Sequence, residues 1–77
     1  MEEQIKQIMA DILKVDLDSI DESSSMENIN SWDSLNHLNL CLALEQEFGV
    51  VLDVSEIESM LSYYDILQVM EKLIAGN

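Results

Sequence analysis

The chain has very few positive charges. It contains no arginine and only three lysines, against 16 acidic residues, which gives a net charge of −13. This composition argues against nucleic-acid binding, because that binding depends on cationic contacts to phosphate. It also disfavours anionic membrane surfaces. We expect protein partners that carry basic patches, and an association that is fast and salt-sensitive.

Cysteines and long apolar runs are also scarce. The single cysteine excludes an internal disulfide and a cysteine-rich zinc site. No stretch approaches the roughly 18 apolar residues of a membrane span, and early charges such as Glu2, Glu3 and Lys6 interrupt any signal peptide. We therefore expect a cytoplasmic, monomeric protein that inserts into no membrane, in a chain complete from Met1 to Asn77.

What the chain does contain is enough apolar material for a core. Apolar residues make up 48% of the sequence and follow regular patterns, which argues against disorder despite the high net charge. The length of 77 residues predicts a single domain over residues 1–77. Because such a short chain buries only about 60% of its unfolded surface, we do not expect a deep enzymatic cleft.

Two segments in the first two thirds of the chain have the apolar spacing of helices. The first covers residues 2–14, with acidic residues at the positive end of its dipole and Lys14 at the negative end. The second covers residues 34–48, has neither glycine nor a β-branched residue, and stops at Gly49.

A short and a long helix are expected after Gly49. Ser55 is expected to cap a brief apolar helix. Ser62 and Asp65 resemble a capping box and open a last helix, which runs through about residue 75 to a terminator at Gly76-Asn77. The predicted fold class is all-α, with three main helices plus one short helix and a long first loop.

That loop covers residues 15–33 and has no sustained period. A loop of this length in so small a domain is usually functional or disordered. Isolated apolar residues along it favour a loop laid onto the core; they are Val15, Leu17, Ile20, Met26 and Ile29.

The helix over residues 34–48 has two apolar faces, which cannot both contact one neighbour. One stripe consists of His37, Leu40, Cys41, Leu44 and Phe48. The second stripe consists of Leu35, Leu38 and Leu42. We expect one stripe to face the core and the other to be covered by the loop, by a partner or by a bound apolar cargo.

Acidic residues surround this helix without any compensating base. No lysine lies between Val15 and Asp65, whereas most of the acidic residues do. A solvated acidic surface is one explanation. An apolar stripe beside uncompensated acids is more typical of a docking face for basic partners.

Ser34 stands where the long loop meets this helix, within Trp32-Asp33-Ser34-Leu35. A phosphoester on its hydroxyl would be stabilised by the helix N-terminus. The alternative is that Ser34 is a simple N-cap.

Asp33-Ser34-Leu35, followed by an apolar helix that ends in Ala43-Leu44-Glu45-Gln46-Glu47-Phe48-Gly49, resembles the acyl carrier proteins of fatty acid and polyketide synthesis. The resemblance covers essentially the whole chain and implies a four-helix acyl-carrier-type bundle. It implies that Ser34, flanked by Asp33 and Leu35, is esterified by 4′-phosphopantetheine, which a phosphopantetheinyl transferase donates from coenzyme A. Such a protein is not itself an enzyme, has no catalytic residue, and presents a thioester-bound acyl group to acyl-loading and acyl-processing enzymes.

The resemblance also implies two surfaces. The acyl pocket would be lined by Leu40, Cys41, Leu44, Leu52, Ile57 and Met60. The partner-docking patch would consist of Leu35, Leu38 and Leu42, with Asp33, Glu45, Glu47, Glu56 and Glu58 around it.

The sequence departs from the family pattern near Ser34. Asn36 and Asn39 replace acids that are usual in synthase-linked members, so recognition by the general fatty acid synthase enzymes is in question. A usual glycine before the Asp-Ser pair is absent, and we expect Asn30 to adopt a left-handed conformation instead. Together with Trp32, His37 is typical of a specialised, stand-alone carrier; we expect a half-buried histidine whose hydrogen bonds are satisfied.

Three other motifs are weaker. Asp16, Asp18 and Glu27 match part of a calcium loop, but Asp21 occupies the position of its glycine, so we expect no metal site of this kind. Asp33, Ser34 and His37 are the residue types of a hydrolase triad, without an oxyanion scaffold. Cys41 is expected to be a buried structural thiol.

Two rivals to the acyl carrier remain open at this point. An aminoacyl or peptidyl carrier would have the same arm and the same fold. An unmodified acidic helical adaptor would bind its partners through the second leucine stripe alone.

Overall fold

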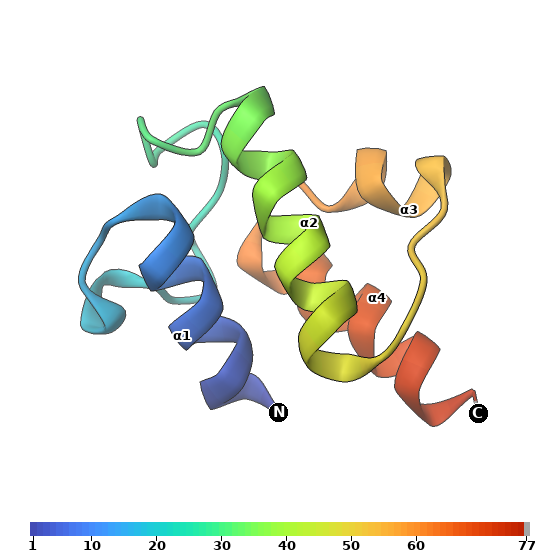
Figure 1. Cartoon of the computed structure of the whole chain (residues 1–77). Coiled ribbons are helices and arrows are strands. Elements are labelled where there is room, and N and C mark those ends of the chain that lie inside the picture. The colour runs from blue at the N-terminus through green and yellow to red at the C-terminus, as the bar shows by residue number, and fades with distance from the viewer. Residues whose placement is uncertain (77) are drawn as a thin grey trace.

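The computed structural model describes residues 1–76 and has four α-helices and one 3₁₀ turn: α1 (Glu2–Leu13), η1 (Leu17–Ser19), α2 (Ser34–Phe48), α3 (Val54–Ser59) and α4 (Tyr63–Ala75). The only β pairing among these residues is an isolated bridge. The all-α prediction, with one short helix and a long first loop, is therefore confirmed. Figure 1 shows α2 crossing the middle of the molecule, with its first turn at the opposite edge from the start of α1.

Helix α1 presents one side to the core, where Ile5, Met9 and Leu13 are fully buried. It ends one residue earlier than predicted, because Lys14 is left-handed (φ 56°, ψ 49°). In that conformation the N–H groups of Lys14 and Val15 both donate to the Ala10 carbonyl, which satisfies the helix end. The prediction of a left-handed Asn30 is wrong: within residues 1–76, Lys14 is the only non-glycine residue with a positive φ.

Helix α2 begins and ends where the sequence predicts. Gly49 is left-handed (φ 64°), and its N–H donates to the Glu45 carbonyl. One side of α2 packs in the core: Leu40 and Leu44 are fully buried there. The expectation that one stripe of this helix faces the core is therefore confirmed, and that stripe is the one that contains Leu40 and Leu44.

The cap of α3 differs from the prediction. Asp53, not Ser55, is the N-cap: its carboxylate accepts a hydrogen bond from the Glu56 N–H, and the Glu56 carboxylate accepts one from the Asp53 N–H. This reciprocal capping box satisfies two N–H groups at once and places Ser55 inside the helix.

Ser62 caps the start of helix α4 as predicted, because its hydroxyl accepts a hydrogen bond from the Asp65 N–H. Gly76 follows its end in a right-handed conformation (φ −74°), so it is not a left-handed stop. The other half of the predicted terminator, Asn77, lies outside the described residues.

The long loop lies on the core, as predicted. Ile20 and Trp32 are buried, and the other apolar anchors are partly buried against the core. The Met26 N–H donates to the Leu61 carbonyl, and the Tyr63 N–H donates to the Ser24 carbonyl, so the loop is paired with the turn between α3 and α4.

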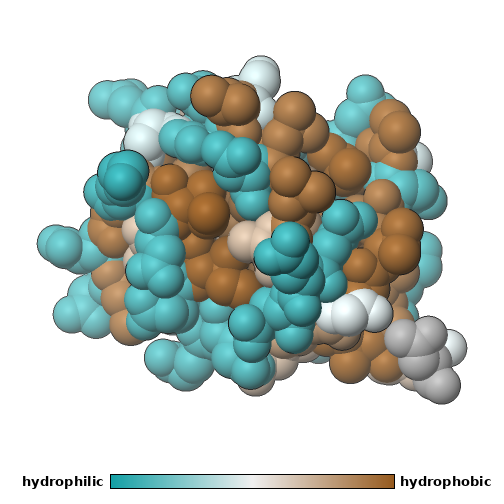
Figure 2. All heavy atoms as spheres, in the orientation of Figure 1, coloured by the Kyte–Doolittle hydropathy of each residue, from teal (hydrophilic) through white to brown (hydrophobic). Residues whose placement is uncertain are grey.

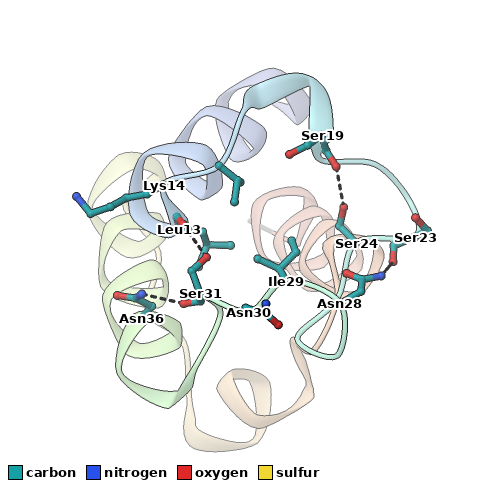
Figure 3. Close-up of a pocket in the computed structure, with 11 residues that line it drawn as sticks. Leu13, Lys14, Ser19, Ser23, Ser24, Asn28, Ile29, Asn30, Ser31 and Asn36 are labelled. Carbon is teal, nitrogen blue, oxygen red and sulfur yellow. Dashed lines mark hydrogen bonds between the residues drawn. The ribbon is translucent and has the colours of Figure 1, made fainter.

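A second tie holds the end of the loop to α1. The Ser31 hydroxyl donates to the Leu13 carbonyl at 2.6 Å, and the Asn36 side-chain amide donates to the Ser31 carbonyl. Figure 3 shows these bonds at the edge of a hollow of about 580 Å³, which hydroxyl and amide side chains of the loop line together with Leu13, Val15 and Ile29. These ties fix the position of the chain just before α2. No helix within residues 1–76 is long and apolar enough to cross a membrane.

Candidate functional site

Ser34 is the first residue of α2, and its neighbour Asp33 does the capping. Asp33 has an extended backbone, and its carboxylate accepts a hydrogen bond from the Asn36 N–H at 2.9 Å. The alternative that Ser34 is a simple N-cap is therefore wrong. Ser34 is exposed, and no hydrogen bond within the described part of the chain uses its hydroxyl. The hydroxyl is thus open to a modifying enzyme.

The start of α2 provides a favourable electrostatic setting for a phosphate. The first N–H groups of a helix have no partner within it, and they carry its positive partial charge. Asp33 engages the N–H of Asn36, which leaves those of Ser34 and Leu35 without a partner among residues 1–76. A phosphodiester on Ser34 would lie beside these two N–H groups.

An apolar pocket opens beside Ser34. Its volume is about 440 Å³, and its walls come from α2, α3 and the long loop. The lining residues are Met26, Ser34, His37, Leu38, Ile57, Glu58 and Leu61. An exposed hydroxyl, two free N–H groups and an adjacent apolar space fit a phosphopantetheine arm and its cargo.

His37 is buried (7% exposed), and both of its ring nitrogens have partners. Trp32 Nε1–H donates to His37 Nδ1 at 3.0 Å, so Nε2 carries the proton and donates to the Ile57 carbonyl at 2.7 Å. A histidine with satisfied hydrogen bonds was predicted, and this is confirmed. Because neither nitrogen is bonded to Ser34, the arrangement is not a hydrolase triad.

The second leucine stripe is exposed, so the loop does not cover it. Leu35, Leu38 and Leu42 are 69%, 53% and 57% exposed. Figure 2 shows hydrophobic atoms gathered over α2 and near α3, bordered by hydrophilic ones. The role of this leucine stripe in docking stays a prediction.

The acidic residues predicted around this stripe have different local roles. Glu45 accepts a hydrogen bond from the Leu52 N–H at 2.8 Å, and Glu56 belongs to the capping box of α3. Asp33 caps α2, whereas Glu47 and Glu58 are exposed. Glu47 and Glu58 are therefore the two whose carboxylates have no structural partner in the described chain.

The side chains predicted to line an acyl pocket are packed in the core. Leu40, Cys41, Leu44 and Met60 are at most 2% exposed, and Leu52 is 6% exposed. Ile57 is partly buried and also lines the pocket beside Ser34. The entry of an acyl chain between these six side chains stays a prediction.

Cys41 is a buried thiol, as predicted. Burial raises its pKa to about 11, and the nearby negative charge of Glu45 adds to this. Within residues 1–76, no group of three or more histidine, cysteine or acidic side chains is placed to hold a metal ion.

Sequence reasoning did not assign Met26 and Leu61 to the site. Met26 was expected only as an isolated apolar residue of the loop, and Leu61 only as an apolar residue of the short helix after Gly49. The hydrogen bond from the Met26 N–H to the Leu61 carbonyl places them together at the pocket, and backbone pairing of this kind leaves no side-chain signal.

Comparison with known proteins decides the family. A family model of the phosphopantetheine attachment site matches residues 3–68. An acyl carrier protein of Thermosynechococcus vestitus is 38% identical over 75 residues, covering 96% of this chain and 91% of that protein. This chain belongs to the acyl carrier protein family. Acyl carrier proteins of Sinorhizobium fredii and Rhizobium meliloti are each 34% identical over 70 residues, covering 91% of this chain and 90% of theirs. Members of this family hold 4′-phosphopantetheine covalently, so the protein is a carrier and not an enzyme.

Proposed function

We propose that Ser34 is the attachment site and that the protein carries an acyl group for partner enzymes of fatty acid, polyketide or related biosynthesis. The observation that carries this proposal is the exposed Ser34 hydroxyl at the first residue of α2, left unbonded because Asp33 caps the helix. When bound, the 4′-phosphopantetheine group supplies a thiol that holds the acyl group as a thioester. An aminoacyl or peptidyl group on the same arm is the alternative cargo.

In the attachment step, the Ser34 oxygen bonds to the phosphorus that bears pantetheine in coenzyme A. The bond between the two phosphates of coenzyme A breaks, and 3′,5′-adenosine bisphosphate leaves with the electron pair. The hydroxyl proton passes to the phosphopantetheinyl transferase. The chain contributes an accessible oxygen and the unpaired N–H groups of Ser34 and Leu35, which would stabilise the negative charge of the phosphodiester.

Intact-protein mass spectrometry tests the attachment site. After incubation with coenzyme A and a broad-specificity phosphopantetheinyl transferase, we expect the protein to gain the mass of one phosphopantetheine group. Ser34→Ala is expected to gain nothing while keeping its helical circular dichroism, and Ser55→Ala, which removes an exposed hydroxyl from α3, is expected to gain the full mass. A mass gain in Ser34→Ala would place the arm elsewhere, and a bare wild-type protein would favour the unmodified adaptor.

We also propose that the exposed leucines of α2 and the acidic residues around them receive basic partner enzymes. This proposal is supported by the exposure of Leu35, Leu38 and Leu42 on a helix that lies within a stretch of the chain, residues 15–65, without lysine. Leu38→Glu is expected to slow loading by the transferase or by a cognate acyl-loading enzyme. The control is Gln68→Glu, which adds the same charge to an exposed position on α4. Equal loading rates for the two variants would remove the leucine stripe from the docking surface.

A further inference from the structure

The pocket beside Ser34 has an open side and a closed side. Leu38 and Leu61 on its rim are 53% and 51% exposed, whereas His37 is 7% exposed and forms its most buried wall. The apolar core lies beyond His37: Leu40, Leu44 and Met60 are fully buried. A cargo that grows from the pocket into the core therefore has to pass His37.

His37 joins three segments through its ring. It belongs to α2, its Nε2–H donates to the Ile57 carbonyl of α3 at 2.7 Å, and its Nδ1 accepts from Trp32 at the end of the loop. Trp32 is itself 2% exposed. Both nitrogens are thus fixed, and turning the ring aside would leave buried polar groups without partners, which is unfavourable.

The neighbours of His37 reinforce this wall. The side chain of Ile57 lines the same pocket. On the closed side of that pocket, the backbone carbonyl of Ile57 accepts the hydrogen bond from His37. Cys41 lies one turn further along α2 and is buried against the ring, with Sγ 3.9 Å from His37 Nε2. A chain that passes between α2 and α3 must displace a hydrogen bond and two side chains.

We propose that the hydrogen bond from His37 to the Ile57 carbonyl closes this pocket towards the core and makes the protein a carrier of short acyl groups. This inference rests on the proposed attachment of the arm to Ser34. A short acyl group fits the apolar pocket formed with Met26, Leu38 and Leu61. A long chain remains outside the core and gains no shelter there.

Carriers loaded with chains of different length test the inference. The apo protein is converted with butyryl- or hexadecanoyl-coenzyme A by a broad-specificity transferase, and intact mass confirms each product. We expect Tm of the hexadecanoyl form to exceed that of the butyryl form by less than about 4 °C. In a domain of this size, a long chain that clearly stabilised the fold would raise Tm by at least this amount. We also expect hydroxylamine to cleave the two thioesters at similar rates. A larger rise in Tm with slower cleavage of the hexadecanoyl thioester would overturn the inference.

Variants at the wall locate the barrier. In His37→Ala, we expect Tm of the hexadecanoyl form to rise by more than about 4 °C above that of the butyryl form. Because both forms carry the same substitution, any loss of stability from the variant itself cancels. If His37→Ala does not fold, Ile57→Ala serves as the second variant. It trims the other side of the wall but keeps the backbone hydrogen bond, so we expect a smaller rise in the same direction.

The matched control is Val54→Ala, which trims an exposed apolar side chain of α3 that lines neither the pocket nor its wall. We expect it to resemble the wild type. If neither wall variant shelters the long chain, His37 is not the barrier. A protein that gains no mass in the loading step contradicts the attachment to Ser34 instead, so the two failures are distinguishable.

Discussion

At the scale of single residues, Cys41 shows how the core controls chemistry. Its thiol is 2% exposed, and burial raises its pKa to about 11. The thiolate is the reactive species, so the native protein is expected to react very slowly with iodoacetamide near neutral pH. The same reagent should label the protein quickly in concentrated urea. The rates are measured by mass spectrometry on the apo form, because the arm adds a second thiol; equal rates in the two solvents would contradict the buried placement.

The raised pKa of Cys41 also predicts that the protein loses stability at alkaline pH. An unfolded Cys41 releases its proton near the ordinary pKa of 9.0, whereas the folded protein retains it up to about 11. Between these pH values the unfolded state binds fewer protons, so the free energy of unfolding falls as pH rises. We expect urea midpoints to decrease across this range and to decrease less steeply in Cys41→Ala. The slope should not vanish, because burial also raises the pKa of Tyr63. Identical slopes in both proteins would show that Cys41 does not contribute.

Tyr63 carries a polar group that the fold does not use. The residue is 2% exposed, and its hydroxyl has no hydrogen-bond partner within residues 1–76. Tyr63→Phe removes a group that is buried without compensation, so the free energy of unfolding is expected to stay constant or to rise by about 1 kcal/mol. Tyr64→Phe, at a 54% exposed neighbour, is the control and should change nothing. A clear loss of stability in urea unfolding of Tyr63→Phe would reveal a hydrogen bond to that hydroxyl.

The limits of the sequence are plain at His37. The sequence predicted a half-buried ring with satisfied hydrogen bonds. The hydrogen bonds are satisfied, but the ring is more buried than predicted, at 7% exposed. Its partners were not predictable, because the carbonyl of Ile57 lies 20 residues away and any residue has a carbonyl. The wall that we propose for the pocket therefore emerges only once α2 and α3 are placed side by side.

At the scale of secondary-structure elements, periodic apolar residues determined α1, α2 and α4 almost to the residue, whereas the ends of helices were harder to predict. Lys14 is left-handed, which lets two N–H groups at the end of α1 donate to the Ala10 carbonyl. These hydrogen bonds offset the low general preference of lysine for this conformation, so residue type alone did not reveal it.

The start of α3 provides a test at the same scale. Asp53 and Ser55 are both common capping residues, and each is followed three positions later by a glutamate, so the capping-box spacing alone did not distinguish them. Asp53→Ala is expected to lower the free energy of unfolding by about 1 kcal/mol, because it leaves the Glu56 N–H without a partner. Ser55→Ala is expected to change it very little. Urea unfolding followed by circular dichroism measures both, and the reverse order of effects would restore Ser55 as the cap.

At the scale of the whole molecule, charge is the dominant feature. Sixteen acidic residues and three lysines share a body of 32 × 23 × 20 Å. The Debye length is about 30 Å at an ionic strength of about 0.01 M, so at that salt concentration every carboxylate interacts with most of the others. Near physiological ionic strength it shrinks to about 8 Å, and most of these repulsions are screened.

Because the repulsions weaken when the chain expands on unfolding, added salt is expected to stabilise the free carrier. Tm of the apo protein should rise between these two ionic strengths, and the rise should be smaller in Glu47→Gln, which removes one exposed charge without a structural partner. Differential scanning calorimetry measures both. A fall in Tm with salt would mean that favourable charge pairs outweigh self-repulsion. A basic partner relieves the same repulsion by supplying opposite charge, so added salt should weaken docking while it stabilises the fold. The opposite salt responses of Tm and of partner affinity therefore distinguish self-repulsion within the carrier from attraction to its partners.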